Sequence, residues 1–444
     1  MPLGSTVLLT GGREELATTT LRRVTWRLIP FLFLLYIVAW LDRVNVGFAA
    51  LQMNSDLGLS SAAFGFGSGI FFLGYCSFEV PSNIILERVG ARLWIARIMV
   101  TWGLISVAMM FVRTPVAFYL LRFLLGVAEA GFFPGVIYYL SLWFPCAQRA
   151  RAIATFMTAV PVTSLVGAPL SAALLGLNGV YGLKGWQWLF LLEGLPAIAL
   201  GVSVVFYLND RPEVARWLAP AERDWLVATL GAEREACLAR RSMGILAALS
   251  DGTVWRLGII FLLAAIGFYG YSLWAPLVIK SLAGISNLRV GLILAAISAV
   301  TIFSMLLNSA RSDRTGERTL HVAVPLLMMG VGFLGCALLR NPALAILSLA
   351  LVPVGHCAAY GPFWSMPTQF LTGVASAGGI ALVATIANVG GFLGPVLIGA
   401  LKTRTGTHGN AFMLLGAFAI TASVLALRLG VATVASSKQP AAAL

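Results

Sequence analysis

The sequence predicts an all-α membrane protein with twelve transmembrane helices, arranged as two pseudo-symmetric six-helix bundles. Three observations predict it: an apolar composition, a regular series of long apolar stretches, and a loop motif that occurs once in each half of the chain. Of the 444 residues, 59% are hydrophobic and 11% are charged, whereas a soluble protein has about 25% charged residues. A lipid bilayer is therefore the expected solvent for most of this chain.

About twelve stretches are long enough to cross a bilayer, which takes roughly 20 mostly apolar residues. They lie near residues 26–51, 62–86, 92–112, 115–140, 151–176, 187–208, 254–280, 287–308, 319–339, 342–365, 377–401 and 410–430. A long polar segment with a short charged helix pattern separates the sixth stretch from the seventh. The predicted units are an N-terminal tail (1–21), an N-terminal bundle (22–208), a linker (209–253), a C-terminal bundle (254–430) and a C-terminal tail (431–444).

The distribution of basic residues predicts how the chain crosses the membrane. Lys and Arg are about three times as frequent in the segments on the side of the N-terminus as on the other side, and cytoplasmic loops carry such an excess. We therefore expect both tails and the linker in the cytoplasm, and the spans in the inner membrane of the cell. The net charge of +13 comes from short loops and not from an extended basic face, which argues against nucleic-acid binding.

The sequence also argues against several chemistries. The five cysteines show no CxxC or metal-ligand spacing, so neither a disulfide framework nor a metal site is expected. The chain has no nucleotide-binding loop and no catalytic triad at a sensible spacing. We therefore expect neither a cofactor nor an enzyme activity.

Two loops share one motif. ERVGAR (Glu87 to Arg92) follows the second span, and DRTGER (Asp313 to Arg318) follows the eighth. Both read acid-Arg-x-Gly-x-Arg, and their separation is close to half the chain. Two six-span halves in parallel orientation, with a site between them near the middle of the bilayer, form a transporter architecture.

This pair of motifs resembles the signature of the major facilitator superfamily. Further stretches narrow the resemblance to the anion:cation symporter family, and within it to bacterial tartrate and phthalate-type permeases: WLDRVNVGFA, GYCSFEVPSNIILERVGAR, RFLLGVAEAGFFPGVIYYL, DRPEVARWL, GPFWSMPTQFL and GGFLGPVLIG. The resemblance runs from Arg22 to Arg428. It implies a carrier of organic anions with protons or other cations, which works by alternating access.

Four charged residues of the first and fourth predicted spans stand out: Asp42 and Arg43 in the first, and Arg122 and Glu129 in the fourth. A charge at the bilayer centre costs at least about 2.5–3.5 kcal/mol, so such residues usually line a pathway. Arg122 and Glu129 are seven residues apart, which places them on one helix face about 10 Å apart along the axis. Asp42 and Arg43 point about 100° apart, so they do not simply neutralise each other.

These residue types suit the joint binding of an anion and protons. Arginine stays charged and can hold a carboxylate through two parallel hydrogen bonds, so Arg43 and Arg122 are predicted to bind the substrate. Burial favours protonation of a carboxylate and a nearby cation favours its ionisation, so Asp42 and Glu129 are predicted to carry protons. The alternative is that all four form static ion pairs between helices. The resemblance favours the first interpretation, because the matching residues of related symporters bind the anion and couple protons.

Aromatic residues are further candidates. Tyr75 in the second span could bond the anion or the carboxylates, and related symporters have a functional tyrosine at this place. Four residues could form the wall of the cavity that belongs to the C-terminal bundle: Tyr269, Trp274, Tyr360 and Trp364. Aromatic residues also form belts at membrane interfaces, so a packing role is the alternative for each.

The eleventh span departs from the family pattern. It reads GIALVATIAN, so that Asn388 is kept as a substrate-binding candidate while Ala384 stands where related sugar-acid carriers have an amide. Fewer polar contacts for hydroxyl groups argue against a polyhydroxy sugar acid. Glu79 fits a gate or a packing contact better than a site, and a lone His356 is more often a structural group.

The sequence thus predicts proton-coupled uptake of an organic carboxylate by a monomeric transporter. Tartrate-like dicarboxylates, aromatic acids and small sugar acids all suit two arginines. Its expected partners are the small anion, protons and the lipid bilayer. An organic-anion exchanger or exporter, and a membrane sensor that has lost transport, are the alternatives.

Overall fold

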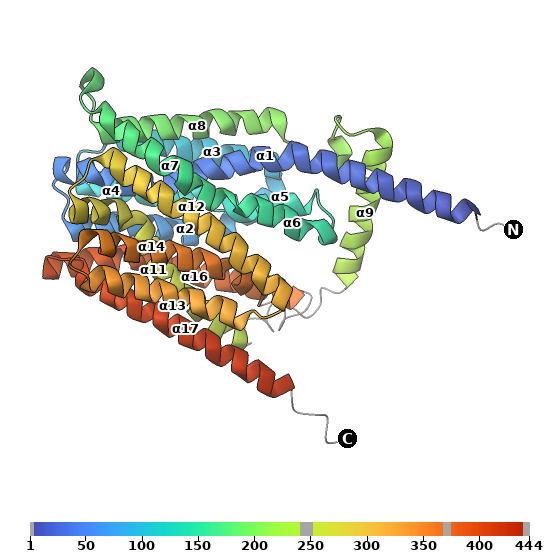
Figure 1. The fold of residues 1–444 in the computed structure, drawn as a ribbon. Helices are drawn as coiled ribbons and strands as arrows, with labels where there is room; N and C mark the ends of the chain where they lie inside the picture. Colours follow the sequence, from blue (N-terminus) through green and yellow to red (C-terminus); the bar gives the residue numbers. More distant parts are fainter. Residues whose placement is uncertain (1–3, 240–251, 367–373, 438–444) are drawn as a thin grey trace.

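The structure, a computed structural model, describes residues 4–239, 252–366 and 374–437. Within these residues every regular element is helical, and twelve spans are long and apolar enough to cross a membrane. This confirms the predicted fold class. Helices α1 (Gly4–Asp56) and α17 (Gly409–Ser437) project from the same end of the bundle, as Figure 1 shows. We name this the terminal end and the other the opposite end.

The first six spans run from α1 to α8. After α1 come α2 (Ser61–Val89), α3 (Ala91–Ala108), α4 (Pro115–Glu129), α5 (Phe132–Ser141), α6 (Cys146–Met157), α7 (Ala159–Leu174) and α8 (Gly185–Tyr207), with 3-10 turns at Met109–Phe111, Leu175–Leu177 and Val180–Gly182. The hydroxyls of Ser60 and Thr114 accept the N–H groups of Ala63 and Ala117, at 3.1 and 3.2 Å. Such caps satisfy amides that have no partner inside a helix, which explains why α2 and α4 begin where they do.

The fourth span, predicted as one helix over 115–140, is broken at its middle. Helix α4 ends at Glu129, and Gly131 takes a φ of 87°, a left-handed conformation that favours glycine. A Cβ at Gly131 would lie 2.3 Å from the hydroxyl oxygen of Ser82. That hydroxyl donates a 2.6 Å hydrogen bond to the carbonyl of Ala130. The break is therefore part of the packing between the second and fourth spans.

The fifth span, predicted over 151–176, is also divided. Helix α6 ends at Met157, Thr158 follows, and α7 begins at Ala159. The linker contains the predicted charged helix, α9 (Pro220–Ala239), after a 3-10 turn at Pro212–Val214. Figure 1 shows α9 beside the projecting part of α1, where Glu222 forms a 2.9 Å ion pair with Arg23.

The last six spans repeat the pattern of the first six. They are α11 (Gly252–Ala283), α12 (Asn287–Thr315), α13 (Thr319–Leu338), α14 (Pro342–Ser365), α16 (Val374–Thr405) and α17. The N-terminal helices pack mainly on one another, as α3 does on α8, and the C-terminal helices do likewise, as α13 does on α14. Most contact between the two groups is made by three helix pairs: α2 with α16, α7 with α12, and α1 with α11.

Glycines let the two groups approach closely at the opposite end. A Cβ on Gly65 of α2 would lie 2.5 Å from the carbonyl oxygen of Pro395 in α16. One on Gly291 of α12 would lie 2.6 Å from the carbonyl oxygen of Ala168 in α7. Only residues without a side chain permit such backbone contact between membrane helices. We name these two contacts the glycine seam.

The two loops with the repeated motif lie at the terminal end. Each turns through a glycine with positive φ, 100° at Gly90 and 70° at Gly316. In the first loop, the backbone N–H of Arg92 donates a 2.9 Å hydrogen bond to the carboxylate of Asp210, which begins the linker. The linker is therefore fastened to the loop between the second and third spans.

Candidate functional site

Five charged side chains are buried within the spans, and all belong to the N-terminal group of helices. They are Asp42, Arg43, Arg122, Glu129 and Glu193, with exposed fractions between 0 and 7%. They come from α1, α4 and α8. In the described part of the C-terminal helices, no Asp, Glu, Lys or Arg is buried.

Arg43 and Glu129 form an ion pair between α1 and α4. The Nε of Arg43 donates to Oε1 of Glu129 at 3.1 Å, and its Nη2 donates to the same oxygen. Three rings surround the guanidinium carbon, those of Trp40, Phe71 and Tyr75, at 5.3, 5.4 and 5.1 Å from their centroids. The ring faces carry partial negative charge and help to stabilise the buried cation.

The helix break explains why Glu129 needs a cation. Its position as the last residue of α4 places a negative charge at the negative end of the helix dipole, where it is unfavourable. Arg43 compensates this charge from the neighbouring helix. The position of Glu129 at the end of α4 therefore favours the ion pair with Arg43.

Arg122 is the least satisfied charge of the group. It is completely buried, its Nη2 donates one long hydrogen bond, 3.4 Å, to the carbonyl of Ser68, and its guanidinium carbon lies 5.0 Å from the ring centroid of Phe71. Its Nε and Nη1 have no hydrogen-bond partner. A buried cation with free donors is costly, and an anion that accepts from those donors would remove the cost.

Asp42 has partners of its own, as its orientation on the helix predicts. Its Oδ1 accepts from Nδ2 of Asn45 at 2.9 Å and from the hydroxyl of Ser106 on α3. Its Oδ2 has no partner. The neighbours Asp42 and Arg43 therefore have different hydrogen-bond partners, Asn45 and Ser106 for one and Glu129 for the other.

Two tyrosines complete the surroundings of the ion pair. Tyr75 is buried on α2, with its ring beside Arg43. Tyr269 comes from α11 in the other half, and its ring lies 4.6 Å from that of Phe72 and 6.3 Å from that of Trp40. Its hydroxyl also interacts with Arg43. Tyr269 is thus a predicted site residue from the C-terminal helices that contacts the buried charges.

Tyr360 and Trp364 belong to an aromatic group between α11 and α14. Their ring centroids are 6.0 Å apart, and both lie next to Phe261. His356 stacks on Phe268 with a centroid distance of 4.1 Å and an interplanar angle of 10°. His356 is therefore enclosed by rings, while its buried Nδ1 has no hydrogen-bond partner, and the structural role expected for it stays a prediction.

Neither of the two remaining candidates contacts an arginine directly in the described residues, although Glu79, the partner of Asn388, interacts electrostatically with Arg43. Nε1 of Trp274 donates to the carbonyl of Pro395 at 3.3 Å, and its ring meets that of Phe64 edge-on at 5.0 Å, so it packs near the glycine seam. Asn388 lies beside Glu79 of α2. This contact joins the halves on the other side of the ion pair.

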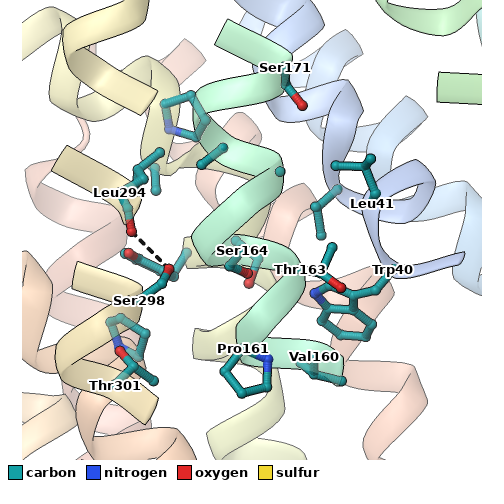
Figure 2. A pocket seen from close by; sticks show the side chains of 18 of the residues that line it. Trp40, Leu41, Val160, Pro161, Thr163, Ser164, Ser171, Leu294, Ser298 and Thr301 are labelled. Carbon is teal, nitrogen blue, oxygen red and sulfur yellow. Dashed lines mark hydrogen bonds between the residues drawn. The ribbon is translucent and has the colours of Figure 1, made fainter. Parts of the chain in front are cut away.

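A cavity of about 70 Å³ lies between the halves, bounded by α1, α7, α11, α12 and α14. Figure 2 shows it, with Trp40 at one side and Ser171 at one end. Its wall carries hydroxyl groups: Thr163, Ser164, Ser171, Tyr271, Ser272, Ser298 and Thr301. Trp40 lines the cavity and also touches Arg43, so this ring separates the cavity from the ion pair.

Glu193 is the buried charge that the sequence predictions do not include. It lies in the middle of the sixth span, and its Oε1 accepts a 2.7 Å hydrogen bond from the hydroxyl of Ser171. The signal was present in the sequence, because an acid within an apolar run is itself a candidate for function.

Twelve spans in two groups, with buried cations and acids inside one of them, are the architecture of a multi-pass membrane transporter. The chain belongs to the major facilitator superfamily, whose model matches residues 32–380. This confirms the recognition from the loop motifs, and it makes the chain a transporter and not an enzyme.

The relatives agree with this assignment. The chain is 50% identical over 412 residues to a presumed tartrate transporter from Agrobacterium vitis, covering 93% of this chain and 95% of that one. It is 40% identical to a quinolone resistance transporter from Acinetobacter baumannii, over 87% of this chain and 89% of that one.

A solved structure has the same fold. The bacterial homologue of the human lysosomal transporter Spinster, in an inward-facing and unoccupied conformation, superposes with a TM-score of 0.71 at 17% sequence identity. The likeness covers 92% of this chain and 96% of that one.

Proposed function

We propose that this protein takes up an organic carboxylate together with protons by alternating access. The observation that carries the proposal is the guanidinium of Arg122, which is fully buried with two donor nitrogens unpartnered. It interacts electrostatically with Asp42, Glu129 and Arg43. A carboxylate is the ligand that best fits a buried arginine fork.

The Arg43–Glu129 ion pair supplies a reason for coupling. While Glu129 is ionised it occupies Arg43, and when Glu129 takes a proton the guanidinium is released for the substrate. Proton binding and anion binding then favour each other, and such coupling is reciprocal. An anion that contacts both arginines is therefore carried best together with a proton.

Two arginines favour a substrate with two acidic groups or one acid and a polar group. A tartrate-like dicarboxylate is our first choice, because a relative with 50% identity is a presumed tartrate transporter. Ala384 on α16 offers no polar contact for additional hydroxyl groups. Aromatic acids and small sugar acids are the other classes to be screened.

The remaining parts of the proposal concern orientation and movement. We place the terminal end in the cytoplasm of a bacterial cell, because basic residues concentrate there, and the spans in the inner membrane. Residues 22–208 and 254–430 are the two bundles that rock about the site, and the protein acts as a monomer. The glycine seam closes the opposite end.

A thermal-shift screen of the purified protein against carboxylates tests the site. A ligand at 100 times its Kd stabilises the folded state by about 2.7 kcal/mol. We expect tartrate or a related acid to raise the Tm of the wild type and to have no effect on Arg122→Ala. Arg122→Lys, which keeps the charge but loses the fork, should bind more weakly than wild type. A shift that Arg122→Ala leaves unchanged would place the ligand elsewhere.

Export is the second candidate, because a relative with 40% identity is a quinolone resistance transporter. Proteoliposomes with an imposed pH gradient separate the two directions. Uptake predicts that tartrate accumulates in the compartment with the lower proton concentration and that protons enter with it. Movement against the proton flux would indicate an exporter, tartrate exchange without proton movement an exchanger, and binding without movement a sensor.

A further inference from the structure

Glu193 is placed deep in the N-terminal group of helices. It lies on α8 and is 2% exposed. The Ser171 hydroxyl donates to its Oε1 at 2.7 Å, while its Oε2 has no hydrogen-bond partner. One oxygen of a buried carboxyl group is therefore left without a donor.

The neighbouring residue Asn45 connects this carboxyl group to Asp42. Asn45 is completely buried, donates to Oδ1 of Asp42 at 2.9 Å, and also interacts with Glu193. Oδ1 of Asn45 and Oδ2 of Asp42 have no partner either. Three acceptor oxygens without donors thus meet in one buried cluster, which we name the acid cluster: Asp42, Asn45, Ser106, Ser171 and Glu193.

Among the residues that the structure describes, no cation interacts with Glu193. Helices α1, α3 and α7 pack around α8, and among the groups that the structure describes, Asp42 on α1 is the one charged residue that interacts with Glu193. Helices α3 and α7 contribute the hydroxyls of Ser106 and Ser171. Asp42 also interacts electrostatically with Glu129 and Arg122 on α4, so one cation faces the two acids of the cluster. Two ionised carboxylates beside a single cation are disfavoured in such surroundings, whereas a shared proton would supply a missing donor.

The acid cluster also has a connection to the cavity. Ser171 contributes to the wall of the cavity of about 70 Å³, and Figure 2 shows it at one end. A water molecule needs about 10–15 Å³ in such a cavity, so several waters fit. The Ser171 hydroxyl can pass its hydrogen to Glu193 and take another from a hydronium ion in the cavity, which leaves Ser171 unchanged.

We propose that Glu193 and Asp42 share a transported proton that Glu129 does not carry, and that Ser171 is its entrance. The proposal rests on the proposed function and deepens it, because it gives the transporter a second proton site with a separate path. Arg43 and Arg122 bind the anion, and the acid cluster binds its proton next to them, with Asp42 interacting electrostatically with Arg122.

Infrared difference spectroscopy tests proton binding without any substrate. The purified full-length protein in lipid is titrated from alkaline to acidic pH, and the C=O band of protonated carboxyl groups is followed. We expect Glu193→Gln to remove one component of this band. Glu129→Gln should remove a different component and keep that of Glu193. Glutamine can still accept from Ser171, so the fold should be retained, and the Tm checks this.

Ser171→Ala keeps the proposal testable if Glu193→Gln does not fold. Loss of the hydroxyl should shift the Glu193 component in frequency and slow its appearance after a pH jump. A component that persists at the most alkaline pH would make Glu193 a permanently neutral structural group. A component that disappears when sodium chloride replaces choline chloride at constant pH would indicate a cation site. Either result, or an unchanged band in Glu193→Gln, would overturn the proposal.

A transport measurement tests whether the proton of the acid cluster moves together with the substrate. In proteoliposomes with tartrate as the probe, the number of protons moved for each tartrate should fall by one in Glu193→Gln. An unchanged ratio would contradict the proposal. A titrating Glu193 band in a protein that does not transport tartrate would contradict the proposed function and leave the proton site intact.

Discussion

The two halves of the molecule have the same sequence of spans but very different interiors. The N-terminal helices bury Asp42, Arg43, Arg122, Glu129 and Glu193, whereas the matching interior of the C-terminal helices is aromatic around Phe268 and His356. Charges are expensive in a membrane, so concentrating them in one half confines that cost. Under the proposed function this difference is a division of labour, in which the charged half holds the anion and the protons and the aromatic half covers them.

The largest effect is expected from Glu129→Gln, which removes the proton site and leaves Arg43 without its partner. Gradient-driven uptake of tartrate should fall at least about 100-fold, because removal of one partner of a buried ion pair costs about 3–5 kcal/mol. The measurement is accumulation in proteoliposomes with an imposed pH gradient. The exposed acid variant Glu213→Gln is the control and should transport as the wild type does. Full gradient-driven uptake in Glu129→Gln would end the assignment of coupling to the N-terminal half.

The second effect concerns the seam that joins the halves. In Gly291→Ala the new Cβ would lie 2.6 Å from the Ala168 carbonyl oxygen, so α7 and α12 must separate. Overpacking costs about 1–3 kcal/mol, which corresponds to about 5- to 150-fold in the population of the state closed at the opposite end.

The initial rate of uptake and the labelling of a cysteine placed at the opposite end both measure this shift. Gly176→Ala is the matched control, because a Cβ at Gly176 meets nothing within 4 Å. Equal rates and equal labelling in the two variants would mean that the seam does not govern access.

A moderate effect on tartrate affinity is expected at Tyr269, the residue of the C-terminal helices that contacts Arg43. Tyr269→Phe removes only a hydroxyl beside Arg43, and a net hydrogen bond contributes about 0.5–1.5 kcal/mol. The apparent affinity for tartrate should therefore fall about 2- to 12-fold, measured as KM for uptake. His356→Phe keeps the stacked ring and should stay within about 3-fold of the wild type on the same scale. Loss of all uptake in His356→Phe would show that the C-terminal half carries chemistry of its own.

The smallest predicted effect is on the free energy of unfolding, and it concerns Glu317 in the loop after α12. Burial alone raises the pKa of Glu317, but hydrogen bonds from the Leu320 N–H and from His321 outweigh it and lower the pKa below its ordinary value of 4.5. A lowered pKa means that the stabilisation is present above pH 4.5 and is lost as the pH falls through the lower value in the folded protein.

Glu317→Gln should therefore cost about 0.5–1 kcal/mol at neutral pH, a small value because the side chain is partly exposed. The difference in Tm from the wild type should shrink as the pH falls below 4.5. A difference that stays constant between neutral and acidic pH would show that the charge of Glu317 is not involved.

Much of the candidate site could be predicted from the sequence because a charge inside a membrane span stands out against its neighbours. Asp42, Arg43, Arg122 and Glu129 were found in this way, and the 100° between successive helix residues predicted that Asp42 and Arg43 have different partners. Their roles in transport stay predictions. The same rule applies to Glu193, an acid within the apolar sixth span that the predictions do not include.

Other features could not be predicted, since they depend on which helices meet. Trp274 and Tyr269 lie five residues apart on α11, yet Tyr269 reaches Arg43 and Trp274 packs on Pro395. The break after Glu129 depends on the contact of Gly131 with Ser82 on another span. Nothing local distinguishes these aromatic residues or this glycine from many others in the chain.

The sequence by itself determined that the chain lies in a lipid bilayer, how many spans it has, that a loop motif is repeated, and which spans contain charged residues. Each of these follows from the identity of residues within a window of a few helix turns. Only the tertiary structure decided the partners: Arg43 with Glu129, Asp42 with Asn45 and Ser106, and Glu193 with Ser171. The reason is physical. The cost of a buried charge depends on the residue itself, but its compensation comes from donors and acceptors on helices that are distant in the chain.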